Sequence, residues 1–303
     1  MLETVKKIFE EEKVSKAYRR INSSHPINIY LGYNSVGEKS LVVIEESMIK
    51  NATSTRMIKV ILGKREDGKI KLEFSLMDKL FEELFYKFCE DIVFASQNSL
   101  KEHAIEDVVN RWTAWKTMFQ NANNEVLSDS IVQGLIGELL FIKNYMIPKY
   151  GFEQAITSWE GPVGGHKDFV IADTWYEVKT CSFSSDTVKI SSLEQLDSIN
   201  VGYLKITRIE KTNETDANAV NLNLIVEEIK EKILSVDILK LYYEKLSNLK
   251  YNYNVLYDKL TFKIGAEKLF EVNENFPRIR RKEIPAQVQS IQYELRISNL
   301  MEG

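Results

Sequence analysis

Four side chains in the middle of the chain have the types and spacing of a divalent-metal site. Asp168, Glu177 and Lys179 follow the pattern D-x8-E-x-K, and Glu138 precedes them. Carboxylate oxygens are the ligands that Mg²⁺ prefers, and a neighbouring lysine can orient water or stabilise charge on a phosphate. The pattern therefore indicates metal-assisted hydrolysis of a phosphate ester. The same spacing also occurs by chance, when glutamate and lysine merely form an ion pair.

A β-hairpin is expected where two of these carboxylates lie. The runs 168–172 and 175–180 are rich in β-branched and aromatic residues and are separated by two turn residues. Because side chains alternate along a strand, an even loop places Asp168, Glu177 and Lys179 on one face, whereas a loop one residue longer reverses this assignment. A loop of Asp173-Thr174 predicts the following pairs: Ala172 with Trp175, Val170 with Glu177, and Asp168 with Lys179.

The third carboxylate, Glu138, belongs to a helix expected over residues 130–145. Glu138 falls at the edge of the helix's apolar stripe, where a carboxylate is costly unless it is paired or binds a metal. Gly134 and Gly137 would let another element approach the helix on that side. The stripe is predicted from apolar residues at helical spacing: Ile131, Leu135, Leu139, Ile142 and Met146, with Val132 and Ile136 beside them.

The combination of Asp168, Glu177-Val178-Lys179 and the helical Glu138 resembles the PD-(D/E)XK nuclease superfamily, which includes many restriction endonucleases. The wider frame GELLF…GP…G…DF…EVKT…SLEQL and the later FPRIRRKEIPAQVQSIQYEL resemble a narrower group within it. Members of that group are restriction-like proteins encoded beside DNA methyltransferases and helicase-like ATPases in bacterial defence operons. The resemblance covers most of the chain, and its one departure is Lys167, where the superfamily motif has proline.

This resemblance implies an α/β fold, with a restriction-endonuclease-like mixed central sheet flanked by helices. Lys179 would orient or deprotonate the attacking water, and Gln195 would line the site. The implied substrate is double-stranded DNA. The implied cofactor is Mg²⁺, for which Mn²⁺ would substitute, held by Asp168, Glu177, the backbone carbonyl of Val178 and, directly or through water, Glu138.

The net charge of −4 argues against a broadly basic DNA-binding surface. Contact with DNA would therefore come from a local patch or from a partner subunit. His166, close to Asp168, is a candidate for contacting a phosphate. The one dense basic cluster comprises Arg278, Arg280, Arg281 and Lys282. For His166 and for this cluster, a solvated loop is the alternative to a phosphate contact, and both interpretations stay open.

Composition places the chain among soluble globular proteins. Its 303 residues, 44% apolar and 28% charged, allow two domains or one elaborated domain with a substantial core. No apolar run is long enough to span a bilayer, and the charged start of the chain is no secretory signal. Cys89 and Cys181 are isolated and predict neither a disulfide framework nor a zinc site. The cytoplasm is the expected location, without a membrane.

Three consecutive parts are expected along the chain. Residues 1–100 predict a strand-rich N-terminal module with flanking helices, 5–20 and 77–97, around strands at 27–34, 40–47, 56–64 and 69–76. Residues 101–214 would form the nuclease core, beginning with a helix over 105–119. The aromatic side chains of that helix, Trp112, Trp115 and Phe119, predict packing between helices rather than a base-stacking surface. Residues 215–303 would form an extension of helices and strands.

Together these features predict a Mg²⁺-dependent DNA endonuclease subunit of a restriction or phage-defence system. One alternative is a catalytically silent DNA-binding or assembly subunit that keeps the nuclease fold. A scaffold independent of nucleic acid is the third class, but it leaves the shared face of Asp168, Glu177 and Lys179 unexplained. The expected partners are a methyltransferase, a helicase-like ATPase or other restriction subunits, and self-association stays open.

Overall fold

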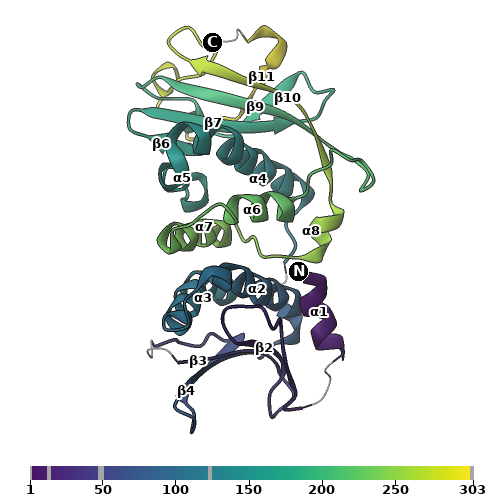
Figure 1. Cartoon of the computed structure of the whole chain (residues 1–303). Helices are drawn as coiled ribbons and strands as arrows, with labels where there is room; N and C mark the ends of the chain where they lie inside the picture. The colour runs from purple at the N-terminus through teal and green to yellow at the C-terminus, as the bar shows by residue number, and fades with distance from the viewer. Residues whose placement is uncertain (1, 12–14, 47–50, 122–124, 301–303) are drawn as a thin grey trace. The chain divides into compact units, whose positions relative to one another are not determined.

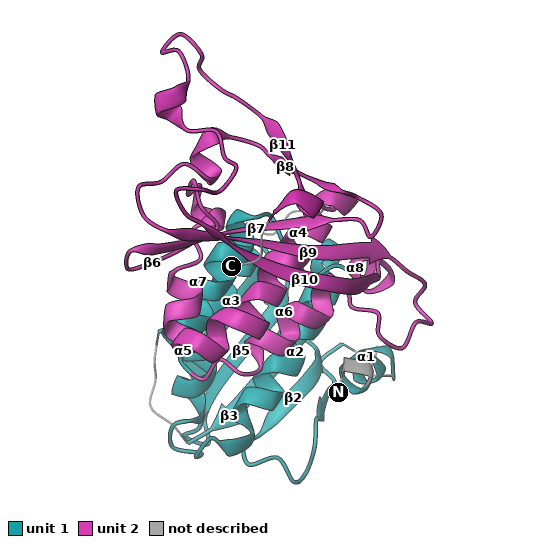
Figure 2. Ribbon diagram, turned by 90° about the horizontal axis from the view of Figure 1, so that it is seen from above, with its two compact units in different colours: residues 1–125, 235–254 teal, residues 126–234, 255–303 magenta. Residues whose placement is uncertain are grey.

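The computed structural model describes the chain except for residues 1, 12–14, 47–50, 122–124 and 301–303 (Figure 1). The chain divides into two compact units, which Figure 2 colours separately. Unit 1 comprises Met1–Glu125 and Ser235–Asn254, and unit 2 comprises Val126–Leu234 and Val255–Gly303. This division differs from the consecutive parts expected from the sequence, because a helix late in the chain returns to unit 1.

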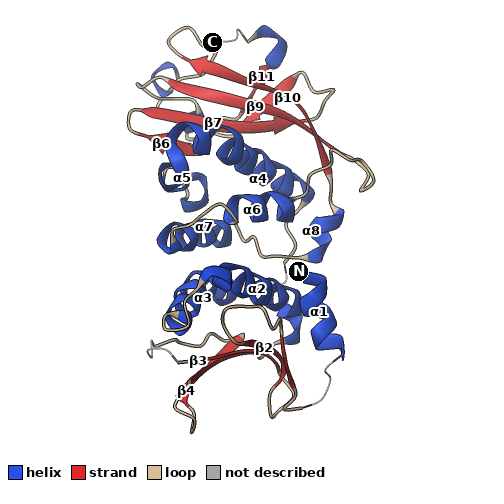
Figure 3. Ribbon diagram, in the orientation of Figure 1, coloured by secondary structure: helices blue, strands red, loops and turns tan. Residues whose placement is uncertain are grey.

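Unit 1 is built on a five-stranded antiparallel sheet in the order β1-β2-β3-β5-β4. Figure 3 shows β2, β3 and β4 of this sheet in red. This sheet confirms the strand-rich N-terminal module. Its strands are β1 Tyr18–Arg20, β2 Ile29–Tyr33, β3 Lys39–Glu45, β4 Ile58–Lys64 and β5 Ile70–Leu76. Its helices are α1 Leu2–Glu11, α2 Glu82–Ala95, α3 Ala104–Asn121 and α7 Val236–Asn248, with 3₁₀ turns η1 Lys79–Phe81 and η2 Ser96–Asn98.

The aromatic residues of α3 pack between helices, as expected. Trp112, Trp115 and Phe119 are buried, and each ring lies 5.5 to 5.8 Å from the ring of Phe88 on α2. Tyr243 of α7 packs on Trp115 at 5.1 Å, which is how α7 completes the core of unit 1. The base-stacking alternative is therefore excluded for these side chains, because their faces are covered within the unit.

The single helix expected over residues 5–20 is wrong. α1 ends at Glu11, residues 12–14 lie outside the described residues, and Tyr18–Arg20 forms strand β1. β1 pairs with β2, where Gly32 allows close approach, since a Cβ on Gly32 would lie 2.0 Å from the Ala17 carbonyl oxygen. Pairing with an existing sheet edge thus overrides the helical pattern. The expected strand 40–47 is confirmed as β3, although its last residue also lies outside the described residues.

Unit 2 is built on a four-stranded mixed sheet in the order β10-β9-β7-β6, in which β7 and β9 are parallel. This confirms the predicted mixed central sheet of an α/β fold. The strands are β6 Phe169–Ile171, β7 Thr174–Cys181, β9 Gly202–Lys211 and β10 Phe262–Val272, and β8 Thr187–Ile190 pairs separately with β11 Tyr293–Arg296. The remaining elements are α4 Asp129–Phe141, π-helical η3 Ile142–Met146, α5 Ile147–Thr157, α6 Leu222–Lys230, α8 Val255–Lys259, and 3₁₀ turns η4 Gly161–Val163, η5 Leu193–Gln195, η6 Arg281–Glu283 and η7 Ile297–Asn299.

The two faces of this sheet are covered differently. α4 lies against β7 on one face, and α6 packs on α4 (Figure 1). Contact with α4 depends on Gly137, because a Cβ there would lie 2.4 Å from the Thr180 Cγ2 atom. The space beside Gly134 is open, so only one of the two glycines has the predicted role. On the opposite face, apolar side chains of β7, β8, β9, β10 and β11 form a continuous core.

The helix expected over residues 130–145 changes character along its length. α4 ends at Phe141 and continues as the π-helix η3, which the periodicity did not predict. The predicted stripe is buried except for Ile131, whose side chain is 52% exposed. None of the helices in the described part of the chain is long and apolar enough to cross a membrane.

Candidate active site

The β6–β7 hairpin has the expected parity but a different register. Phe169 pairs with Tyr176 and Ile171 with Thr174, so the loop is Ala172-Asp173. Ala172 has a φ of 50°, the left-handed conformation that tight hairpin loops use. The predicted pairs are therefore wrong by two residues, because the sequence alone does not specify which two residues form the loop. The shift is even, so the predicted face is preserved: Asp168 lies opposite Glu177 by continuation of the register.

Asp168 stands immediately before β6 and is held by backbone groups on both sides. Its carbonyl oxygen accepts hydrogen bonds from the N–H groups of Glu160 at 2.7 Å and Gly161 at 3.2 Å. Its Oδ2 atom accepts a hydrogen bond from the Val178 N–H at 2.7 Å. The N–H and C=O of one strand residue point to the same side, so the Val178 carbonyl is directed toward the edge where Asp168 lies.

Glu177 is the most deeply buried acidic group of this site, with 1% of its surface exposed. Its Oε1 atom lies 2.7 Å from the Lys179 Nζ atom, yet neither oxygen receives a well-aligned hydrogen bond from the described residues. Burial raises the pKa of Glu177 to about 8, and the negative charge of Asp168 acts in the same direction. A buried carboxylate with a single charged partner and no further donors is costly, and a bound cation would reduce that cost.

Glu138 reaches the same place from α4. Its Oε2 atom accepts a hydrogen bond from the Trp159 indole N–H at 2.6 Å. Burial raises the pKa of Glu138 well above its ordinary value, and the charge of Asp168 raises it further. A Cβ on Gly161 would lie 3.3 Å from both Glu138 Oε2 and Asp168 Oδ1, so this glycine leaves room beside both carboxylates. No sequence pattern identified Trp159 as a partner of Glu138.

Lys167, which stands where the family motif has proline, contacts the turn that carries Gln195. Its Nζ atom lies 3.9 Å from the centre of the Trp175 ring and donates to the carbonyl oxygens of Glu194 and, at 3.2 Å, Asp197. Burial lowers the pKa of Lys167 to about 8. These contacts hold the turn η5 that carries Gln195. The Oε1 atom of Gln195 in turn accepts a hydrogen bond from the Lys179 Nζ atom at 3.0 Å.

Most of the basic cluster makes internal contacts. The Arg278 guanidinium donates to the Leu196 carbonyl at 2.6 Å, and that of Arg280 pairs with Glu274 at 2.8 Å. Arg281 donates to the carbonyl oxygens of Val288 and Ala286 at 2.6 and 3.3 Å. These bonds fold the segment after β10 onto itself and onto the turn near Gln195. Lys282 and His166 are exposed.

The donor set fits a Mg²⁺ ion that keeps part of its water shell. In the described part of the chain, no three His, Cys, Asp or Glu side chains are arranged to hold a metal by themselves. Mg²⁺ characteristically binds through one or two carboxylates and retains several waters. Asp168, Glu177 and the Val178 carbonyl could supply such a set. A cation would also give the buried Glu177 oxygens a partner, since neither has a well-aligned hydrogen bond among the described residues. Glu138 and Asp168 both border the space beside Gly161, so Glu138 lies next to this donor set.

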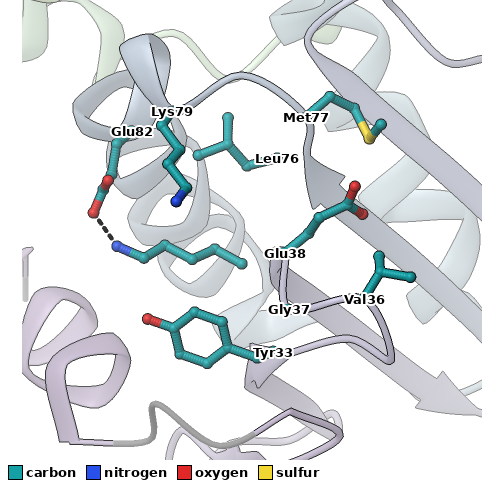
Figure 4. Close-up of a pocket in the computed structure, with 9 residues that line it drawn as sticks. Tyr33, Val36, Gly37, Glu38, Leu76, Met77, Lys79 and Glu82 are labelled. Atoms are coloured by element: carbon teal, nitrogen blue, oxygen red, sulfur yellow. Dashed lines mark hydrogen bonds and ion pairs between the residues drawn. The ribbon is translucent and has the colours of Figure 1, made fainter.

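Unit 1 contains a cavity of about 380 Å³, in which Lys39 and Glu82 already form an ion pair (Figure 4). Lys39 forms an ion pair with Glu82 and a hydrogen bond with the Tyr86 hydroxyl. The lining residues are Tyr33, Val36, Gly37, Glu38, Lys39, Leu76, Met77, Lys79 and Glu82. None of the acidic groups of the candidate site is among them, so the cavity is not a part of it.

Comparison with protein families identifies one match. The model of a family described as "Putative PD-(D/E)XK family member, (DUF4420)" matches residues 5–298, which cover both units. Comparison with curated proteins and comparison with solved structures gave no match.

Proposed function

Because the chain belongs to this PD-(D/E)XK family, we propose that it is a Mg²⁺-dependent endonuclease that hydrolyses DNA phosphodiester bonds. One observation carries the proposal. Glu177 is buried beside Asp168, and its one close polar partner among the described residues is the Lys179 ammonium, which lies 2.7 Å from Oε1 without a well-aligned hydrogen bond. A carboxylate that served only the fold would have its donors within the protein.

Asp168, Glu177 and the Val178 carbonyl would hold the ion, with Glu138 contributing through water. When bound, Mg²⁺ lowers the pKa of a coordinated water and offsets negative charge on the scissile phosphate. The Lys179 ammonium is fixed between Glu177 and Gln195, at 2.7 and 3.0 Å. From there it orients the attacking water and stabilises charge that develops on the phosphate oxygens.

Within the cell the chain would act as a subunit of a restriction or phage-defence system, on double-stranded DNA. The likeness of the frame from Gly137 to Leu196 to restriction-like operon proteins supports this role. The net charge of −4 supports a second expectation, that a methyltransferase, a helicase-like ATPase or another subunit contributes most of the DNA affinity.

A plasmid-cleavage assay tests the proposal, with Mg²⁺, with Mn²⁺ or with a chelator, and with or without the neighbouring operon proteins. Asp168→Asn, Glu177→Gln and Lys179→Met should each lower the cleavage rate by about 10²–10⁴-fold. Lys189→Gln is the control, because Lys189 is exposed on β8. Full cleavage by Lys179→Met would contradict the assigned site. A protein that binds Mg²⁺ and DNA under all these conditions without cutting would instead be the silent subunit.

A further inference from the structure

Trp159 connects two carboxylates of the candidate site that come from different elements. Its side chain is fully buried, and its indole N–H donates to the Glu138 Oε2 atom at 2.6 Å. Its ring stacks on the ring of Phe169, the first residue of β6, with 6.5 Å between the ring centres. Trp159 therefore contacts both α4, which carries Glu138, and the strand that directly follows Asp168.

The backbone around Trp159 also holds Asp168. Trp159 forms an antiparallel bridge with Phe169. One residue further along the chain, the Glu160 N–H donates to the Asp168 carbonyl oxygen at 2.7 Å. The same short segment therefore fixes the position of the Trp159 indole and of the Asp168 backbone.

The indole leaves acceptor positions of Glu138 available. A carboxylate has about four lone-pair sites, and Glu138 accepts no second side-chain hydrogen bond from the described residues. Its side chain is only half-buried, so water can reach it. The bonded oxygen, Oε2, borders the space beside Gly161 together with Asp168 Oδ1. The hydrogen bond thus sets the direction of the Glu138 carboxylate and still allows it to bind water.

Unit 1 contains the same kind of contact in a different setting. The Trp115 indole N–H donates to the Asp91 Oδ2 atom, also at 2.6 Å. Asp91 in addition forms an ion pair with Arg111, which neutralises its charge. Trp159, by contrast, is an uncharged donor, so it orients Glu138 and leaves the negative charge of that carboxylate for a cation.

We propose that Trp159 is a positioning residue, which holds the Glu138 carboxylate beside Asp168 in the direction needed to bind the water shell of a divalent ion. This inference rests on the proposed function, in which Glu138 contributes to the metal site through water. Groups that hydrogen-bond to metal ligands orient those ligands, and their loss typically lowers metal affinity about 10–100-fold. Because the contact of Glu138 is indirect, the lower end of this range is expected.

Metal binding is measured without DNA, so that the result does not depend on cleavage. Calorimetry with Mg²⁺ and electron paramagnetic resonance with Mn²⁺ compare the wild type with Trp159→Phe, which keeps an aromatic ring and removes the N–H. The affinity for either ion should fall about tenfold. Trp115→Phe is the matched control, because it removes an indole bond of equal length to a buried carboxylate. It should lower the melting temperature and leave the affinity for both ions unchanged.

A double-variant cycle tests whether Trp159 acts through Glu138. In the Glu138→Ala background, Trp159→Phe should change the ion affinity by less than about twofold, because the carboxylate that the indole orients is absent. A Trp159 that only fills the core predicts the same loss in both backgrounds. If Trp159→Phe does not fold, benzothienylalanine at position 159 takes its place, since sulfur replaces the N–H and the size of the ring is kept.

The outcomes distinguish this inference from the proposed function. A loss of ion affinity on replacing Trp159 that is absent in the Glu138→Ala background supports the positioning role. Unchanged affinity, or an equal loss in both backgrounds, overturns the inference and leaves the proposed nuclease function standing. A wild type that binds neither ion refutes the metal site of the proposed function and this inference with it.

Discussion

The two units treat buried carboxylates in opposite ways. Asp91 of unit 1 is 1% exposed, like Glu177 of unit 2, but it accepts two hydrogen bonds from Arg111 at 2.6 and 2.7 Å and one from the Trp115 indole at 2.6 Å. Glu177 has only the ion-pair contact with Lys179, without a well-aligned hydrogen bond. Equal burial with unequal partners is what we expect if Asp91 has a structural role and Glu177 binds a ligand.

Two more buried glutamates of unit 1 follow the pattern of Asp91. Glu45 accepts hydrogen bonds from the backbone and side-chain N–H groups of Asn28 at 2.6 and 2.8 Å. Glu73 pairs with Lys71 at 2.6 Å and accepts a hydrogen bond from Ser75 at 3.1 Å. In unit 2, by contrast, the charge of Asp168 raises the pKa of both Glu138 and Glu177, and that of Glu177 also raises the pKa of Glu138. The comparison therefore favours a structural role for the first group and a binding role for the second.

The largest effect on stability is expected at Asp91. Asp91→Ala removes the carboxylate that the half-buried Arg111 guanidinium and the Trp115 indole share, which should lower the free energy of unfolding by about 3–5 kcal/mol. Urea denaturation measures this loss. The double variant Asp91→Ala with Arg111→Met should recover part of it, because the guanidinium that Asp91 neutralised is also removed. A loss below about 1 kcal/mol in the single variant would show that Asp91 does not have the structural role assigned to it here.

Glu177→Gln should raise the free energy of unfolding of the metal-free protein, whereas Asp91→Ala lowers it. Because burial raises the pKa of Glu177 to about 8, its stabilising protonated form is lost as pH rises from the ordinary carboxyl range through about 8. Without metal, the variant should therefore exceed the wild type in unfolding free energy by about 2–4 kcal/mol near pH 9 and match it near pH 4. Thermal melts across this range measure the difference.

Added Mg²⁺ provides the control for that experiment. The ion binds the charged carboxylate, so it should stabilise the wild type more strongly as pH rises and should stabilise Glu177→Gln little at any pH. If the metal-free wild type instead became more stable as pH rises, Glu177 would not be a carboxylate whose burial disfavours its charge.

Lys167 tests whether the turn η5 positions Lys179, the proposed catalytic lysine. Lys167→Met keeps the contact with the Trp175 ring but removes the hydrogen bonds to the carbonyl oxygens of Glu194 and Asp197. With Gln195 less firmly held, kcat should fall about tenfold while KM for DNA stays within about twofold. Gln195→Ala is the matched comparison and should behave alike. An equal rise in KM instead would point to a DNA contact by Lys167 itself.

The smallest effect is expected at Glu138, which the Trp159 indole already partly satisfies. Glu138→Gln removes a charge that burial and Asp168 disfavour, so metal-free protein should gain about 1 kcal/mol or less. Because Gln can still accept the indole hydrogen bond, the fold should be unaffected. Melting curves with and without Mg²⁺ should show a smaller response to the ion than in the wild type. A lower stability without metal would assign Glu138 a purely structural role.

Local chemistry was readable from the sequence wherever periodicity and parity decide it. Strand alternation placed Glu177 and Lys179 on one face, and helical spacing placed Trp112 and Trp115 in a core. Glu138 at the edge of an apolar stripe was identifiable as a carboxylate that needs a partner. These features depend on neighbours within a few residues, and the repeat of a helix or strand determines where such neighbours lie.

Tertiary structure decided the contacts between residues that are distant in the chain. The hairpin register, the indole of Trp159 on Glu138, and the hold of Lys167 on the turn of Gln195 depend on which segments meet. The same holds for the return of α7 to unit 1 and for the internal bonds of Arg278 and Arg280. No periodic pattern in the sequence predicts these contacts between distant segments. They form because burial of the whole core selects one packing among the many that the local sequence permits.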